Sequence, residues 1–298
     1  NEFVTDKVKL KLNIYSEQDS KNQPLLQELD SAQKSVMANV GDSINEAYFN
    51  TSDSLSEFDA TLVLYRKVDT VGVNGIYNDV FVYSTDPANA RWNVSFSEVG
   101  VGNGDYVQDV RSANGRVFKW IEPVNGVSQG NFRPVQLLIT PKQRRMITLG
   151  GDIQLRPNKK LYIETAWSDN DINLYSNLDK ANDHGVATRL RYDQRTSLSE
   201  DTINGWKLNS RIDYEFAGRN FRALEPYRPA EFVRDWNVSG NNFTANEHIV
   251  AAEAAFTKAR WGTAGYQLKS YQRGAAYSGW NNGIFSDLNY KNFVLRGT

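Results

Sequence analysis

A loop rich in Asp and Asn holds the clearest candidates for chemistry in this 298-residue chain. Its oxygen-bearing side chains are Asp169, Asp171, Asn173, Asp179, Asn182 and Asp183. Ca²⁺ prefers clustered carboxylate and carbonyl oxygens, and Asp169-x-Asp171-x-Asn173 begins like an EF-hand loop. The match then fails, because Leu174 replaces the required Gly and Lys180 stands where the bidentate Glu belongs. The loop is a candidate calcium site, and a solvated polar loop is the alternative.

Catalytic residues are harder to assign. The chain has no Cys, which excludes cysteine nucleophiles and disulfides, and neither of its two His, His184 and His248, has the partners of a catalytic triad. Paired carboxylates can cleave glycosidic bonds, and the candidates are Glu164, Asp169, Asp171 and Glu231. Spacing along a chain does not define a separation across a cleft, so no catalytic residue is assigned.

Aromatic residues make up 12% of the chain, and four of them fall in expected loops. These are Tyr227, Trp236, Tyr277 and Trp280. Exposed rings beside Asn and Arg can stack on sugars or anchor a protein partner, which makes these four the candidate ligand-binding residues. The alternative is that they pack loops onto a barrel rim or form an interfacial belt.

A glycine series, Gly100-x-Gly102-x-Gly104, could suggest phosphate binding. The residues that follow include neither the Lys nor the helix that a phosphate cradle requires. These glycines instead predict a tight bend beside a strand.

The composition excludes several classes of protein. The 34 basic and 35 acidic residues give a net charge of −1, so we expect no nucleic-acid partner. The longest apolar runs, such as 62–65, 80–83 and 249–252, are shorter than the roughly 20 residues of a membrane-spanning helix or the roughly 7 of a signal-peptide core. Because the chain opens on Asn1 and soon alternates as a strand does, we expect a processed chain or a segment of a longer one.

The dominant hydrophobic period is two, which sends successive side chains to opposite faces of a sheet. Over residues 206–216, the even positions are mostly apolar and the odd positions are ionic or amide. Strands of a parallel sheet would instead read as continuous apolar runs, so we predict an all-β, antiparallel fold. The expected strands cover residues 8–15, 61–68, 145–155, 160–168, 185–194, 206–216, 248–257 and 263–273.

One helix is expected, over residues 24–40, where apolar residues recur at helical spacing between Pro24 and Gly41. It would lie in a helical insertion over residues 16–59 of a single β-rich domain that covers residues 1–298. Such a helix is either a lid or plug on the β framework or a surface helix that covers a sheet edge.

The connections after residue 145 alternate between short and long. Turns at 156–159 and 258–262 are short, whereas the connections at 169–184 and 217–247 are long. This layout is typical of up-and-down β-barrels of the outer membrane, and several strands reach the 9 to 11 residues that a tilted strand needs to cross the hydrocarbon. A soluble β-sandwich would give the same two-faced strands, so both architectures stay open.

Several stretches resemble parts of large outer-membrane or surface proteins of the Bacteroidota. They are residues 22–26, 63–69, 102–106, 167–176 and 225–237. The resemblance covers most of the chain and implies a β-rich, barrel-forming segment in the cell envelope. It implies no catalytic residues, and the chain departs from the aromatic C-terminus common in such barrels because it ends on Thr298.

These patterns together predict a non-enzymatic barrel segment with transmembrane β-strands. Its expected setting is the bacterial outer membrane or cell surface, with outer-membrane lipid around it and transport, assembly or surface binding as its task. The alternative is a soluble secreted β-sandwich that binds glycan or protein through the loop aromatics, and a weaker one is a carboxylate-dependent glycoside hydrolase. Calcium is the one candidate cofactor.

Overall fold

The computed structural model describes residues 2–21, 28–73, 75–110, 116–238, 244–290 and 293–297. The chain divides into two compact units, where the sequence led us to expect one β-rich domain with an insertion over residues 16–59. The first, here called the sheet unit, comprises residues 1–19, 142–172 and 179–298. The second, the insertion unit, comprises residues 20–141 and 173–178. Among the described residues, no helix is long and apolar enough to cross a bilayer.

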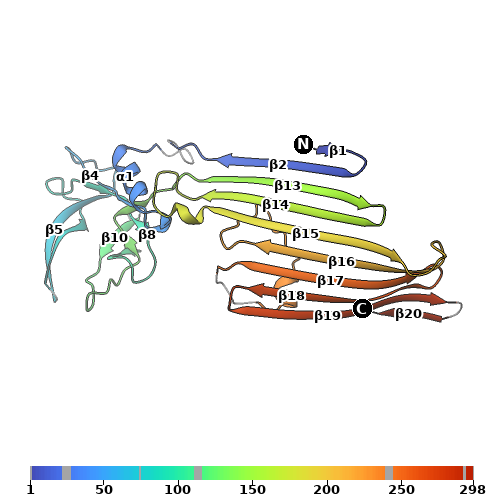
Figure 1. Ribbon diagram of the computed structural model, residues 1–298. Helices are drawn as coiled ribbons and strands as arrows, with labels where there is room; N and C mark the ends of the chain where they lie inside the picture. Colours follow the sequence, from blue (N-terminus) through green and yellow to red (C-terminus); the bar gives the residue numbers. More distant parts are fainter. Residues whose placement is uncertain are drawn as a thin grey trace. The chain divides into compact units, whose positions relative to one another are not determined.

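The sheet unit is built on one ten-stranded sheet in which chain neighbours are also spatial neighbours (Figure 1). Every pair of adjacent strands is antiparallel. In order across the sheet, the strands are β1 (Glu2–Val4), β2 (Val8–Gln18), β13 (Gln143–Arg156), β14 (Lys159–Asp171), β15 (His184–Ser197), β16 (Trp206–Ala217), β17 (Glu247–Lys258), β18 (Gly262–Arg273), β19 (Tyr277–Tyr290) and β20 (Phe293–Gly297). This confirms the expected all-β, up-and-down architecture as an open barrel segment, with β1 and β20 at its edges among the described residues.

The longest connections of this sheet lie at one of its two ends. At the opposite end the chain connects strands through residues 5–7, 157–158, 198–205 and 259–261. At the other end it runs through residues 19–142, which contain the insertion unit, and through 172–183, 218–246 and 274–276. We call these the short-turn end and the long-loop end. The long connection expected over residues 217–247 is present, and it contains the short helix α2 (Phe232–Asp235).

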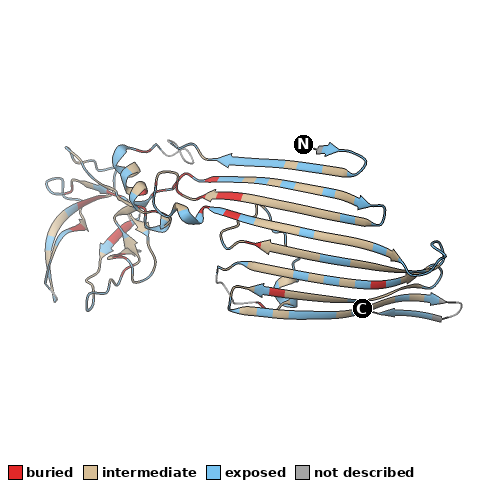
Figure 2. Cartoon of the chain, viewed as in Figure 1, coloured by how far each residue is buried: buried red, intermediate tan, exposed pale blue. Residues whose placement is uncertain are grey.

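The two faces of the sheet differ in chemistry, because the register aligns like residues across strands. One row across the apolar face is Ile153, Leu161, Tyr192, Ile212, Ala252 and Leu268. The neighbouring row on the polar face is Asp152, Tyr162, Arg191, Asp213, Ala251 and Lys269. Few residues of the ten strands are buried (Figure 2). The buried apolar residues of this unit are Ala217, Val238, Ala255 and Tyr271.

The insertion unit is also β-rich and encloses an aromatic core. One sheet consists of β4 (Ser52–Ser54), β7 (Trp92–Val94), β5 (Leu64–Gly72) and β6 (Gly75–Tyr83), and the other of β10 (Val117–Trp120), β9 (Tyr106–Asp109), β11 (Phe132–Arg133) and β8 (Ser97–Glu98). Tyr65 and Phe81 of the first sheet pack with Tyr106 and Phe118 of the second. A two-stranded sheet pairs β3 (Tyr48–Asn50) with β12 (Val135–Leu137).

The helix α1 (Ser31–Asn39) is present but begins later than expected. Residues 24–27 lie outside the described residues, and residues 28–30 are not helical. Asp30 caps the helix, since its carboxylate accepts the Gln33 N–H at 2.7 Å while the Gln33 side chain accepts the Asp30 N–H at 3.0 Å. The lid or plug role of this helix remains a prediction.

The glycine series lies in the insertion unit and has the expected structural role. Gly100 and Gly102 adopt positive φ angles of 94° and 76°, which favour glycine. Gly104 forms an isolated bridge with Gly130, and a Cβ on Gly104 would collide with the backbone of Phe132. The series therefore allows two backbone segments to approach closely.

Candidate functional site on the polar face

The polar face of the ten-stranded sheet carries ion pairs that link neighbouring strands. Asp213 accepts two hydrogen bonds from Arg189, Nε to Oδ1 at 3.1 Å and Nη2 to Oδ2 at 2.8 Å, and a third from Arg191 Nε at 2.7 Å. Arg211 Nε donates to Asp193 at 2.7 Å. Bidentate pairs of this kind fix side-chain geometry as well as charge. The face therefore presents an ordered, ionic surface of the kind that stays in contact with water.

The connection over residues 218–246 folds back onto this polar face through one arginine. Arg228 lies 2.5 Å from Glu215 of β16 and 3.1 Å from Glu247 of β17, and Glu247 also lies 3.4 Å from Arg273 of β18. We call these four residues the Arg228 cluster. Each side chain is only about one fifth exposed, between 19% and 21%. At this burial an ion pair is poorly screened, so the cluster holds the loop against the strands.

Aromatic rings also attach the connection over residues 218–246 to the strands. Tyr271 is 1% exposed on the polar face of β18 and packs against Phe232, Trp236 and Tyr277, with ring centroids 5.2, 5.4 and 5.3 Å away. The Tyr277 hydroxyl donates to the Trp236 carbonyl. Beneath Trp236 lies Gly279, where a Cβ would come within 3.2 Å of the indole ring. The loop is thus seated on the strands by close packing as well as by charge.

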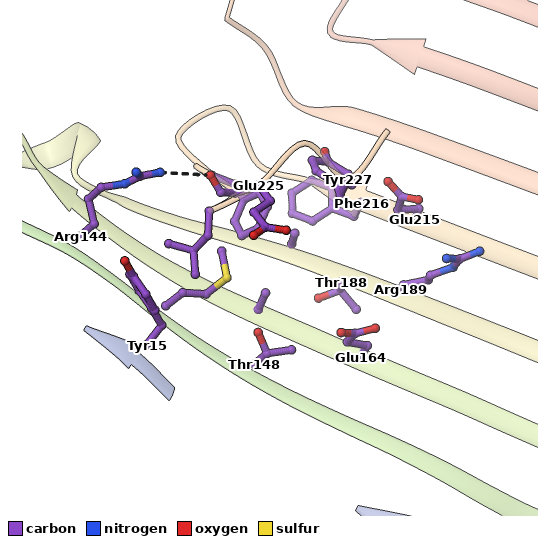
Figure 3. Close-up of a pocket in the computed structure, with 16 residues that line it drawn as sticks. Tyr15, Arg144, Thr148, Glu164, Thr188, Arg189, Glu215, Phe216, Glu225 and Tyr227 are labelled. Carbon is purple, nitrogen blue, oxygen red and sulfur yellow. Dashed lines mark hydrogen bonds between the residues drawn. The ribbon is translucent and has the colours of Figure 1, made fainter. Parts of the chain in front are cut away.

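A hollow of about 620 Å³ lies between this loop and the polar face (Figure 3). The polar-face strand residues are Tyr15, Arg144, Met146, Thr148, Glu164, Ala166, Ala187, Arg189 and Glu215, and the loop contributes Phe221, Ala223, Leu224, Glu225 and Tyr227. Thr188 and Phe216 also border the hollow, although by strand alternation they belong to the apolar face. Arg144 donates to the Ala223 carbonyl at 3.5 Å, which ties the loop to β13. Desolvation by the surrounding protein raises the pKa of Tyr227, and the nearby Glu247 and Glu215 raise it further while Arg228 lowers it.

The hollow is lined by both apolar and charged side chains. Its described lining contains no Ser, Cys or His, so the groups in it that could act as acids or bases are the carboxylates of Glu164, Glu215 and Glu225. Two of its carboxylates are already engaged: Glu164 accepts from the Tyr162 hydroxyl, and Glu215 pairs with Arg228. Mixed apolar and charged side chains suit a polar solute that carries an apolar or aromatic portion.

The four aromatic residues expected to bind a ligand do not form one site. Trp236 and Tyr277 are joined by a hydrogen bond and both pack on Tyr271, whereas Tyr227 lines the hollow. Trp280 lies on the apolar face, where it is 66% exposed. Side chains alternate between the faces along β19, so Trp280 points away from the polar face that carries Tyr277. Sequence reasoning missed Arg228 and Tyr271, although Tyr271 stands at a polar-face position of a strand it had located.

The expected calcium ligands are separated or engaged by cations. Lys180 Nζ lies 2.6 Å from Asp171 and 3.7 Å from Asp183, so an ammonium group stands between those carboxylates. Asp169 accepts from Gln143 at 3.0 Å. Asn173 belongs to the insertion unit and donates to the carbonyls of Met37 and Gly41, while Asp179 precedes the 3₁₀ turn Lys180–Asn182 with a φ of 59°. In the described part of the chain, no three His, Asp or Glu side chains are grouped to hold a metal ion.

The carboxylates proposed for a glycosidase are likewise dispersed. Of Glu164, Asp169, Asp171 and Glu231, only Glu164 lines the hollow. Asp169 and Asp171 lie at the end of β14 in the interactions just described, and Glu231 directly precedes α2. His184 stacks on Trp167 at 5.6 Å between ring centroids, and His248 bonds to the Tyr214 hydroxyl at 2.9 Å.

Comparison of the chain with models of protein families, with characterised proteins and with solved structures finds no match. The likeness to Bacteroidota surface proteins therefore stays a prediction. Any function must be argued from the two faces of the sheet and from the loop that lies on one of them.

Proposed function

We propose that the sheet unit is a wall segment of an outer-membrane β-barrel, with its apolar face toward lipid and its polar face toward a water-filled lumen. The observation that carries this proposal is the exposure of the apolar face. Ile14, Ile212 and Ile284 are 69%, 55% and 75% exposed on it, and Trp280 is 66% exposed. Removing a large apolar side chain from water is worth about 1.5–3 kcal/mol, so a whole face of them favours a nonpolar surrounding.

The length of the apolar face supports the proposal. In β16 the apolar side chains run from Trp206 to Phe216, ten residue steps that span roughly 33 Å along the strand. At the tilt of about 40° common in barrels, this projects to about 25 Å, the height of the lipid-facing band. Rings mark both ends of that band, with Trp206 near Trp261 at one end and Phe216 near His248 at the other.

The connections support the same orientation. Outer-membrane barrels have short periplasmic turns and longer extracellular loops, and the three longest connections of the sheet unit, 19–142, 172–183 and 218–246, all lie at one end, where only 274–276 is short. We place the long-loop end at the cell surface. The loop held by the Arg228 cluster then lies on the lumen side near the outer opening, where it narrows the passage. The insertion unit is carried by a connection at that same end, which suits a role in transport or binding at the surface.

Two adjacent alanines of β17 provide a matched test. Ala252 lies on the apolar face between Ile212 and Leu268, whereas Ala251 lies on the polar face between Asp213 and Lys269. With the full chain folded in phosphatidylcholine bilayers, we expect Ala252→Arg to lower the free energy of unfolding by about 2–4 kcal/mol and Ala251→Arg to change it by less than about 1 kcal/mol. The measurement is denaturant unfolding followed by tryptophan fluorescence.

The opposite result would overturn the proposal. A soluble sheet whose apolar face meets water would accept an arginine at the exposed Ala252. A chain that stays monodisperse without detergent and tolerates Ala252→Arg as well as Ala251→Arg is not a barrel wall.

A further inference from the structure

A second hollow, of about 550 Å³, lies on the apolar face at the short-turn end of the sheet unit. Its lining is apolar throughout: Leu198, Trp206, Phe256, Trp261, Ala264 and Leu288. Trp206 and Trp261 meet edge to face with their ring centroids 6.1 Å apart. The Trp261 carbonyl accepts the Asn289 N–H at 2.8 Å, which fixes the turn that carries this ring. The hollow is therefore an apolar recess with two packed indole rings in its lining.

The Lys258 ammonium borders this recess. Lys258 pairs with Trp206 across β16 and β17, and its Nζ lies 5.3 Å from the Trp206 ring and 4.7 Å from the Trp261 ring. Cation–π attraction to two indoles holds the ammonium at the edge of the hollow. Among the residues that the structure describes, no carboxylate lies within ion-pair distance of Lys258, so its charge is available to an anion.

We infer that this recess binds one anionic phospholipid, with its phosphate on Lys258 and an acyl chain against Trp206, Phe256 and Trp261. The inference rests on the proposed function, because that function places this face in lipid. The chemistry of the recess matches an amphipathic ligand whose negative group and hydrocarbon chain are adjacent. The short-turn end faces the periplasm in the proposed orientation, so the lipid comes from the inner leaflet of the outer membrane.

Brominated lipids test this site because bromine quenches nearby tryptophan. The full chain is folded in phosphatidylcholine bilayers that contain an equal small mole fraction of brominated phosphatidylglycerol or brominated phosphatidylcholine. Quenching is measured for the unaltered protein and for Trp261→Phe, and the part that is lost in the variant reports on the recess. We expect this part to be larger with the anionic lipid in the unaltered protein, because that lipid is enriched about fivefold near Lys258.

Three variants assign the effect to the charge of Lys258. Lys258→Gln is expected to remove the excess quenching, and Lys258→Arg to retain it. Lys207→Gln is the matched control, since Lys207 follows Trp206 but lies on the polar face, where it pairs with Thr257. It is expected to retain the full excess.

The outcomes separate this inference from the proposed function. Equal quenching by both brominated lipids, or an excess that survives Lys258→Gln, would overturn the lipid site and leave the barrel wall in place. An absence of quenching by either lipid would overturn both. An excess that is lost in Lys258→Gln and in Lys207→Gln alike would show general charge attraction in place of a site.

Discussion

The two units of this chain place their apolar side chains in opposite ways. The insertion unit buries its large rings between two small sheets, where Tyr65, Phe81, Tyr106 and Phe118 are at most 7% exposed. The sheet unit buries few of its strand residues (Figure 2) and carries exposed apolar side chains on one face and its charges on the other. Since both units consist of antiparallel strands, strand periodicity alone does not reveal what surrounds the apolar face of a sheet. The difference lies in whether a second layer of protein covers the apolar face.

Among the substitutions that test this contrast, Phe118→Ala in the insertion unit is expected to have the largest effect on the free energy of unfolding. Phe118 stacks on Phe96 with centroids 4.6 Å apart and lies in the buried cluster, so its loss leaves a cavity. We expect the free energy of unfolding of this unit to fall by about 3–5 kcal/mol. Ile212→Ala on the apolar face should cost less than about 1.5 kcal/mol in a bilayer, because mobile lipid fills the space that the side chain leaves. Equal costs in denaturant unfolding would contradict the distinction.

A smaller effect is expected from Arg228→Gln in the sheet unit. The substitution leaves Glu215 and Glu247 without the cation that they share, which we expect to cost about 2–3 kcal/mol and to release the loop over residues 218–238. The measurement is limited proteolysis in detergent, with cleavage of that loop faster by at least tenfold. Arg234→Gln is the control, because Arg234 lies in the same loop but is 77% exposed beside Asp235. Equal cleavage of both variants would show that the Arg228 cluster does not hold the loop.

The smallest effect concerns two hydroxyls in the core of the insertion unit. The Tyr106 hydroxyl accepts the Phe81 N–H at 2.9 Å, and the Tyr65 hydroxyl accepts the Phe118 N–H at 3.0 Å. Tyr106→Phe leaves a buried N–H without its acceptor, so we expect a loss of about 1–2 kcal/mol in thermal unfolding. A change below about 0.3 kcal/mol would mean that the N–H finds another acceptor.

The same tyrosine predicts a dependence on pH. Burial raises the pKa of Tyr106 from 10.0 to about 12, so the unfolded chain ionises at a lower pH than the folded unit. Stability from this group is fully present below pH 10 and is lost as the pH rises through about 12. We expect Tyr106→Phe to reduce the steepness of alkaline unfolding relative to the unaltered protein.

Long alternating strands could be located from the sequence, and other elements could not. The strand expected over 206–216 is observed as Trp206–Ala217, because a period of two maintained over ten residues has few alternative structures. Strand β19 was missed since Ser278, Asn282 and Ser286 interrupt its apolar positions and Gly279 and Gly283 are unfavourable in strands. The strands of two to four residues in the insertion unit are too short to show any period.

The site was less predictable because its contacts are distant in sequence. Phe232 and Trp236 meet Tyr271 only once β17 and β18 have paired, and no local pattern encodes that meeting. The calcium site stays a prediction, and the sequence interpretation did not anticipate that the Lys180 ammonium lies 2.6 Å from Asp171 and 3.7 Å from Asp183. Charge balance within a loop is visible in the sequence and was the usable signal.

The base of the insertion unit has a consequence for how the chain is assembled. The Asp19 N–H donates to the Lys142 carbonyl at 2.9 Å, the Lys142 N–H donates to the Asp19 carboxylate at 2.9 Å, and Gln18 pairs directly with Gln143. Strands β2 and β13 are thus joined as tightly as a two-strand hairpin, although a whole folded body separates them in the sequence. A body whose own ends lie together imposes almost none of the entropic penalty of a long flexible loop. We expect that residues 20–141 can be exchanged for another folded segment, together with the matching residues 173–178, without shifting the pairing of β2 with β13.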